Sequence, residues 1–169
     1  MNMNKLELNQ LIESKRKLDE EKSALNFEER LKLWNEIITT ERMICKEKEY
    51  EYAEPYDFGI KFFTEIKLKT DFNYTFVEID NLKIKFSGTE ELKFGGINDE
   101  VFESHEFIGK GIDLCGSFII NNSSWKNRLQ KQNSIHDCYD EGYWKKVNHF
   151  IIRTKDGEFS CLARDWEIA

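Results

Sequence analysis

The chain has one proline, three histidines, no Cys-x-x-Cys pair and no long apolar run. A membrane-spanning helix needs about 18 or more consecutive apolar residues, and no run approaches that length. Residues 1–5 also lack the apolar stretch with which a secretory signal peptide would begin. From these absences we expect a cytoplasmic protein.

The cysteines are few and widely spaced, at positions 45, 115, 138 and 161. Without Cys-x-x-Cys spacing they match neither a zinc ribbon nor a redox motif. Cys45, Cys115 and Cys161 lie in apolar runs and are expected to be buried thiols. An even number would allow two disulfide bonds in an exported chain, but without an export signal we expect free cysteines.

Basic residues are outnumbered, with 25 Lys and Arg against 32 Asp and Glu, so the net charge is −7. Most of this excess lies in one acidic segment, residues 89–106, which holds six acidic residues and one basic residue. Non-specific nucleic-acid binding needs a basic surface, so this charge balance argues against it. The acidic segment is instead suited to a basic partner.

What is present is enough for a packed core, because 40% of the residues are hydrophobic and 14% are aromatic. No internal repeat or linker-like tract divides the chain. We therefore expect a single domain over residues 1–169, with a helical region at 1–50 and a β-rich region at 57–169.

Two capping boxes predict two N-terminal helices. Asn4 precedes Glu7 and Asn26 precedes Glu29 by the three residues that let each side chain bond the other's backbone amide. Apolar residues at helical spacing follow both boxes, and the polar stretch 20–26 predicts a turn between the helices. The helices could pack on a sheet as a hairpin or protrude as a dimer surface, and one apolar stripe does not decide between these.

Beyond the helical region the apolar residues alternate, which predicts strands. The turn at 80–81 should join two of them in a hairpin that pairs Ile79 with Leu82 and Val77 with Ile84 on its apolar face.

The C-terminal strand runs, 147–154 and 158–166, flank an Asp-Gly pair at 156–157 that is typical of a two-residue type I′ turn. Such a turn pairs Ile152 with Cys161 and leaves apolar side chains on both faces. This second hairpin should therefore lie inside the fold.

Between the hairpins, Ser87 and Gly88 should end the first one, and a short helix is predicted at 123–133 with Asn122 or Ser123 as its cap. Further short strands are expected at 92–94, 107–108 and 112–121. The predicted class is α+β: an N-terminal helical pair packed on a mainly antiparallel sheet of about five to seven strands, with a short helix before a C-terminal β-hairpin.

The densest group of reactive side chains lies at 136–141, with a histidine further on. His136, Cys138 and His149 are the candidate zinc ligands, because thiolate and imidazole are the usual ones. Their spacing matches no metal motif, so we expect a polar loop with one packed cysteine, and neither metal nor other cofactor. Cys138 activated by His149 would be a nucleophile, but nothing indicates a lowered thiol pKa or an oxyanion hole, and we predict no catalytic residue. His149 is expected to be a hydrogen-bonded residue at the edge of the core.

The acidic segment supplies candidate interface residues around Phe102, namely Asp99, Glu100, Glu103 and Glu106. Such a charge run is usually a solvated loop or short helix, and His105 within it is expected to be solvated. It could also steer a basic partner, with Phe102 and Phe107 as buried anchors.

Three aromatic residues near the second hairpin, Tyr139, Tyr143 and Trp144, extend the candidate interface, because Tyr and Trp are enriched at binding surfaces. They could equally close the end of the sheet.

Localised acidity beside poor catalytic motifs favours a protein-binding protein over an enzyme. We expect an inhibitor or immunity-type protein that engages a basic site on a protein partner. Two alternatives stay open. The chain could be a small enzyme or a ligand- or metal-binding domain with a site near His136, Cys138 and His149, or a structural protein that forms a homodimer through its N-terminal helices.

Overall fold

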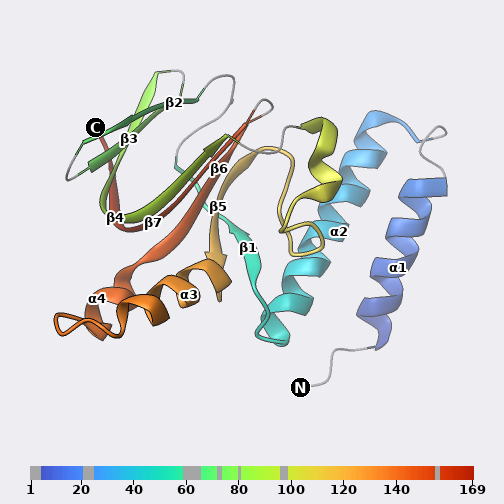
Figure 1. Cartoon of the computed structure of the whole chain (residues 1–169). Coiled ribbons are helices and arrows are strands. Elements are labelled where there is room, and N and C mark those ends of the chain that lie inside the picture. Colours follow the sequence, from blue (N-terminus) through green and yellow to red (C-terminus); the bar gives the residue numbers. More distant parts are fainter. Residues whose placement is uncertain are drawn as a thin grey trace.

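The computed structural model describes residues 5–20, 25–58, 66–71, 74–79, 81–95, 99–154 and 157–169. They form an N-terminal helix pair, an antiparallel sheet of seven strands and two short helices before the last two strands (Figure 1). The strand order in the sheet is β1-β5-β6-β7-β4-β3-β2. The predicted α+β class is confirmed.

The helices are α1 (Lys5–Glu20), α2 (Phe27–Glu47), α3 (Ser124–Asn133) and α4 (Glu141–Lys146), with one 3₁₀ helix, η1 (Asp99–Ser104). The strands are β1 (Tyr52–Pro55), β2 (Ile66–Thr70), β3 (Tyr74–Ile79), β4 (Leu82–Gly95), β5 (Gly116–Asn121), β6 (Asn148–Arg153) and β7 (Glu158–Ile168). Among the helices of the described residues, none has the length and apolar character needed to cross a membrane.

The second capping box is present as predicted. The Glu29 amide donates to the Asn26 side chain over 3.0 Å, and the Asn26 amide donates to the Glu29 carboxylate over 2.9 Å. The first capping box begins at Asn4, which lies outside the described residues. α1 lies beside α2 (Figure 1), and Lys15 joins it to the buried carboxylate of Glu41 over 2.7 Å. α1 therefore packs against α2, and α2 in turn packs against β1 (Figure 1).

The first β-hairpin has the predicted register. Ile79 is paired with Leu82 and Val77 with Ile84. All of these except Leu82, which is half-buried, have no exposed surface. The alternation of apolar and polar residues along β3 and β4 therefore predicted correctly which face of the hairpin is buried and which is solvated.

β4 does not end at Gly88, where the sequence predicted an end. Gly88 takes the left-handed conformation (φ +60), and the pairing with β7 shifts by one residue between Thr89 and Glu91. A bulge of this kind bends a strand without ending it. β4 continues to Gly95 and includes the strand predicted at 92–94, because pairing with a distant partner, β7, maintains it.

The register of the second hairpin differs from the prediction. Ile152 is paired with Phe159 rather than with Cys161. The Thr154 amide donates to the Gly157 carbonyl over 2.8 Å, so the loop is longer than the Asp-Gly signal implied. The difference is two residues, and it leaves every side chain on its predicted face because strand side chains alternate with period two.

Four further elements differ from the prediction. Residues 107–108 form turns rather than a strand, and β5 begins at Gly116 rather than at 112. Phe107 and Ile112 are apolar because this loop packs on the sheet, not because they alternate along a strand. β1 and α4 were missed because four and six residues are too few to show a period.

The sheet curves around a core that both of its ends share. Val77 of β3 and Phe150 of β6 belong to one buried cluster, although β4 and β7 lie between their strands. Large aromatic side chains fill this cluster, and those with at most 2% exposure are Phe58, Phe86, Phe150 and Phe159.

Two smaller clusters cover the opposite face of the sheet. One joins η1 and the following loop to β5 and β6 through Phe102, Phe107 and Ile151. The other seats α3 and α4 on β7 through Trp125, Trp144 and Leu162. The short helices are therefore held by the sheet.

Ile152→Val is expected to lower the free energy of unfolding by about 0.5 to 1.5 kcal/mol, because a methylene leaves a site with no exposed surface. Ile135→Val is the matched control, since Ile135 is 82% exposed and should show almost no change. Urea denaturation measures both. Equal values for the two variants would contradict the burial of the second hairpin.

Candidate functional site

A buried ionic cluster, formed by His105, Arg153 and Glu158, joins the end of η1 to the sheet. Arg153 and Glu158 face each other at the loop end of the β6–β7 hairpin, with Nε 3.4 Å from Oε2. His105 Nε2 lies 2.8 Å from the same carboxylate oxygen. The Arg153 guanidinium also lies 4.6 Å from the ring centroid of Phe102 in η1.

His105 is 4% exposed, so the prediction that it is solvated was wrong. Its Nδ1 accepts the Phe107 amide over 3.1 Å, so this nitrogen carries no proton and Nε2 is the donor to Glu158. Both ring nitrogens are therefore occupied within the protein. The histidine therefore holds η1 in place. From the sequence alone, a single histidine among acidic residues could not be assigned to this role rather than to a solvated position.

Burial lowers the pKa of Arg153, and the negative charge of Glu158 opposes that shift. An arginine remains protonated in either case. Glu158 also accepts a bond from the Ser160 hydroxyl over 3.0 Å, so its carboxylate is held from several sides. The cluster is thus a fixed support for η1.

Outside this support, Glu103 and Glu106 are exposed. Glu106 lines a hollow of about 290 Å³ together with Phe94, Lys93, Gly95, Ser104, His105 and Glu158. Phe94, near the end of β4, is 53% exposed. Asp99 and Glu100 belong to η1, but their side chains lie outside the described part of the chain. The hollow therefore presents an acidic, an aromatic and a basic side chain to solvent, namely Glu106, Phe94 and Lys93.

The aromatic half of the predicted interface lies elsewhere. Trp144 is 4% exposed and Phe102 is also 4% exposed, so both are part of the chain's own core. Tyr139 is half-buried and its hydroxyl accepts a bond from Gln130 over 2.8 Å. Figure 1 shows α4 and η1 at opposite ends of the sheet. The structure does not bring the acidic and aromatic candidates together.

Tyr143, on α4, is half-buried and donates its hydroxyl hydrogen to the carboxylate of Glu90. Burial, and then this bond to Glu90, raise the pKa of Tyr143 to about 12. The hydroxyl therefore remains a donor at neutral pH. It joins α4 to the bulge of β4.

The candidate metal ligands are also separated. His136 and Cys138 are exposed and line a hollow of about 410 Å³ beside α4, so Cys138 is not the packed cysteine that was predicted. His149 is 2% exposed and lies between the rings of Phe107 and Trp125. Within the described ranges no three His, Cys, Asp or Glu side chains gather as metal ligands. Among the other cysteines Cys45 and Cys161 are buried, whereas Cys115 is exposed because it precedes β5 in a loop.

One contact was not foreseen from the sequence. The Ser123 hydroxyl caps α3 by accepting the Lys126 amide over 3.1 Å, and it lies 2.9 Å from His149 Nδ1. A Ser-His pair can be a nucleophile and its base. Here Ser123 is 3% exposed, and burial with repulsion from Lys93 lowers the pKa of His149 to about 3. So weak a base beside a buried hydroxyl serves the helix cap rather than catalysis.

Comparisons with protein-family models, with curated proteins and with solved structures returned no match to this chain. The structure adds Phe94, Arg153 and Glu158 to the residues singled out from the sequence, and only their contacts across the fold reveal them.

Proposed function

We propose that this chain is a protein-binding protein of the inhibitor or immunity type. Its acidic surface, defined here as Glu103, Glu106 and the neighbouring Phe94, engages a basic site on a partner protein. The observation that supports this most is that the exposed Glu106 lines the same hollow as the exposed Phe94, and that Glu103, three residues earlier, is also exposed on a segment that the buried ionic cluster holds in place.

A fixed acidic surface suits binding for two physical reasons. Exposed charges of one sign raise the rate of encounter with a partner of opposite sign. A segment that is already ordered loses little conformational freedom on association, so more of the contact energy appears as affinity. Phe94 can add the apolar contact that charges alone do not supply.

The buried polar groups of the described residues also favour binding over catalysis. His105 and Glu158 bond to each other, and Ser123 caps a helix beside His149. Each of these side chains therefore stabilises the fold through its hydrogen bonds.

The test begins with a pull-down from native extract, followed by mass spectrometry to identify the partner. The double variant Glu103→Gln and Glu106→Gln should then slow association at low salt on the order of tenfold, because steering acts through exposed charge. At 1 M salt, where the screening length is about 3 Å, the variant and the unmodified protein should associate at similar rates. Stopped-flow mixing measures both.

The matched control is the double variant Glu47→Gln and Glu49→Gln, which removes the same charge from two exposed positions, the last residue of α2 and a residue just after the helix. It should leave association within about twofold. An equal loss in the control would assign the effect to net charge, and an unchanged rate in the first variant at low salt would remove this surface from the interface.

A further inference from the structure

The outer face of β2, β3 and β4 gathers lysine side chains around two aromatic rings. Residues paired across neighbouring strands point to the same face of a sheet, so the register places these side chains together. The lysine face, as we name it, consists of Lys67 and Lys69 on β2, Tyr74 and Phe76 on β3, and Lys83 and Lys85 on β4. The intervening side chains, such as Val77 and Ile84, point the other way into the core.

The lysine face is open to solvent. Lys67 and Lys69 are exposed, Tyr74 is 37% exposed, and the other three side chains are half-buried. Figure 1 shows β2 and β3 at the end of the sheet away from α1 and α2, while α3 and α4 pack on β7. The face therefore stands clear of the helices that cover other parts of the sheet.

The charge of the lysine face differs from that of the whole chain, which is −7. Among the paired residues of β2 and β3 and their partners on β4, this face carries four lysines and one carboxylate, that of Glu78, which lies 3.5 Å from Lys83. Glu167 of β7 lies 2.7 Å from Lys85, whereas the two lysines of β2 lie on the side away from β7. Exposed charges act over only about 8 Å at physiological ionic strength, so an anion at this face meets mainly lysines.

Each ring of the lysine face lies beside an ammonium group. Lys85 Nζ is 4.0 Å from the centroid of the Tyr74 ring, and Lys83 Nζ is 4.6 Å from that of the Phe76 ring. Two residues along a strand span about 7 Å, so the two pairs form adjacent steps. Because a lysine side chain has a flexible stem, a planar group can replace the ammonium on the ring while the ammonium meets a neighbouring anion.

A hollow of about 370 Å³ opens next to Tyr74 and Lys85. Sites for small ligands have volumes of roughly 300 to 1,000 Å³. Ser87, Arg164 and Asp165 also line this hollow, and Arg164 Nε lies 2.6 Å from Asp165 Oδ2. The hollow therefore places an aromatic ring beside two cations and two further hydrogen-bonding groups.

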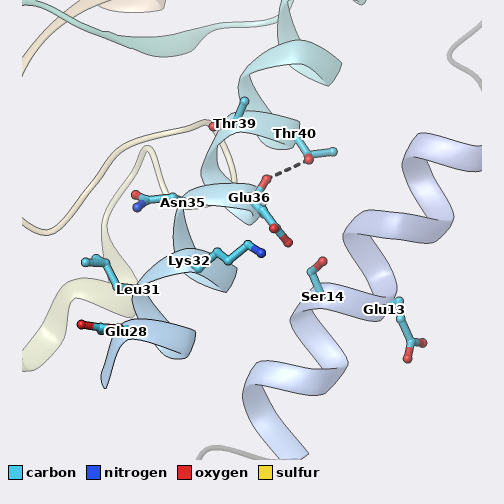
Figure 2. A pocket seen from close by; sticks show the side chains of 9 residues that line it. All are labelled: Glu13, Ser14, Glu28, Leu31, Lys32, Asn35, Glu36, Thr39 and Thr40. Atoms are coloured by element: carbon cyan, nitrogen blue, oxygen red, sulfur yellow. Dashed lines mark hydrogen bonds between the residues drawn. The ribbon is translucent and has the colours of Figure 1, made fainter. Parts of the chain in front are cut away.

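The hollow of about 860 Å³ along α1 and α2 is less informative. Figure 2 shows Lys32 and Glu36 pointing toward α1, so opposite charges stand together there. Among the described residues that line it there is no aromatic ring. It indicates no particular ligand, whereas the lysine face combines positive charge with two rings.

We propose that the lysine face binds single-stranded nucleic acid. Bases stack on Tyr74 and Phe76, the lysines of β2 and β4 on either side contact the phosphates, and the Ser87 hydroxyl and the Asp165 carboxylate bond to the edge of the base on Tyr74. An acidic peptide would use the lysines but leave the rings without a role, and a duplex keeps its bases stacked on one another. The net charge argues against binding over the whole surface, not against binding at this one face.

Fluorescence anisotropy of the full chain with a labelled oligothymidine of about 12 nucleotides tests the proposal. Binding should be saturable at low salt, and the logarithm of the binding constant should fall with that of salt with a slope of about −2 to −3, as three or four phosphate contacts require. Lys67→Gln with Lys69→Gln should weaken binding about tenfold and reduce that slope by about 1.4. The matched control, Lys131→Gln with Lys145→Gln, removes the same charge from exposed positions on α3 and α4 and should stay within about twofold. No binding up to about 1 mM protein, or an equal loss in the control, overturns the proposal.

A second pair of variants tests the stacking. Tyr74→Leu should weaken binding about tenfold without changing the salt slope, whereas Tyr74→Phe keeps the ring and should stay within about twofold. Tyr74 is exposed enough for both variants to fold normally, which circular dichroism verifies. Equal binding by Tyr74→Leu and Tyr74→Phe would overturn the proposal. So would displacement of the oligothymidine by polyglutamate or by duplex DNA of equal charge as readily as by unlabelled oligothymidine, since it would assign the face to anions in general.

Discussion

Glu158→Gln is expected to lower the free energy of unfolding by about 3 to 5 kcal/mol, the range for breaking a buried ion pair by removing one partner. The amide keeps the shape of the carboxylate but not its charge. Arg153, which has no exposed surface, would then remain charged without the carboxylate that now lies 3.4 Å from its Nε. The Glu158 bonds to His105 and Ser160 would weaken as well.

Urea denaturation followed by circular dichroism measures this loss. Glu106→Gln is the matched control, because it makes the same chemical change on the exposed side of the same hollow and should alter stability by no more than about 0.5 kcal/mol. The double variant Arg153→Met and Glu158→Gln should recover part of the loss, since it removes the buried guanidinium together with the carboxylate beside it. If Glu158→Gln costs as little as the control, the cluster does not hold η1 to the sheet.

Acidification is expected to remove about 3 kcal/mol of stability between pH 6.5 and pH 4 through His149 alone. Burial, and then repulsion from Lys93, lower the pKa of His149 from 6.5 to about 3 in the folded protein. Between these two values the unfolded chain binds a proton that the folded protein does not. The free energy of unfolding therefore falls by about 1.4 kcal/mol for each pH unit. The contribution is fully present above pH 6.5 and is lost as the pH falls toward 3.

Carboxylates also titrate in this range, so the measurement must isolate the histidine. His149→Asn keeps a polar atom near the Ser123 hydroxyl but cannot take up the proton. Between pH 6.5 and pH 4 the free energy of unfolding of this variant should therefore fall by about 3 kcal/mol less than that of the unmodified protein. His136→Asn, at an exposed histidine, should decline as steeply as the unmodified protein. Parallel curves for the protein and its His149→Asn variant would show that His149 does not titrate differently on unfolding.

Local signals predicted the elements that depend on neighbours in the chain. The Asn26 and Glu29 side chains bond to each other's backbone, and the β3–β4 register follows from a short turn between alternating strands. Elements that depend on distant partners were not predictable in this way. β4 passes Gly88 because β7 pairs with it, and the longer β6–β7 loop is held by a Thr154 bond that the Asp-Gly signal does not anticipate.

In the candidate site, too, features that depend on local sequence were predictable and those that depend on distant contacts were not. That Glu103 and Glu106 are solvated was predictable, because a run of acids rarely packs in a core. The burial of His105 was not, since it requires Glu158, which lies 53 residues further along the chain. Composition indicates which side chains are polar, whereas only tertiary contacts determine which polar side chains find a buried partner.

The position of β7 has a consequence for synthesis of the chain on the ribosome. It follows every other strand that the structure describes, yet it lies in the middle of the sheet between β6 and β4. Until Glu158–Ile168 has left the exit tunnel, β4 and β6 each present an open edge and cannot be joined. The β3–β4 hairpin and the helices can form as they emerge, but the sheet closes only when β7 follows. During that interval the nascent chain exposes strand edges that can pair with other chains, so its demand for chaperones should be greatest just before these residues appear.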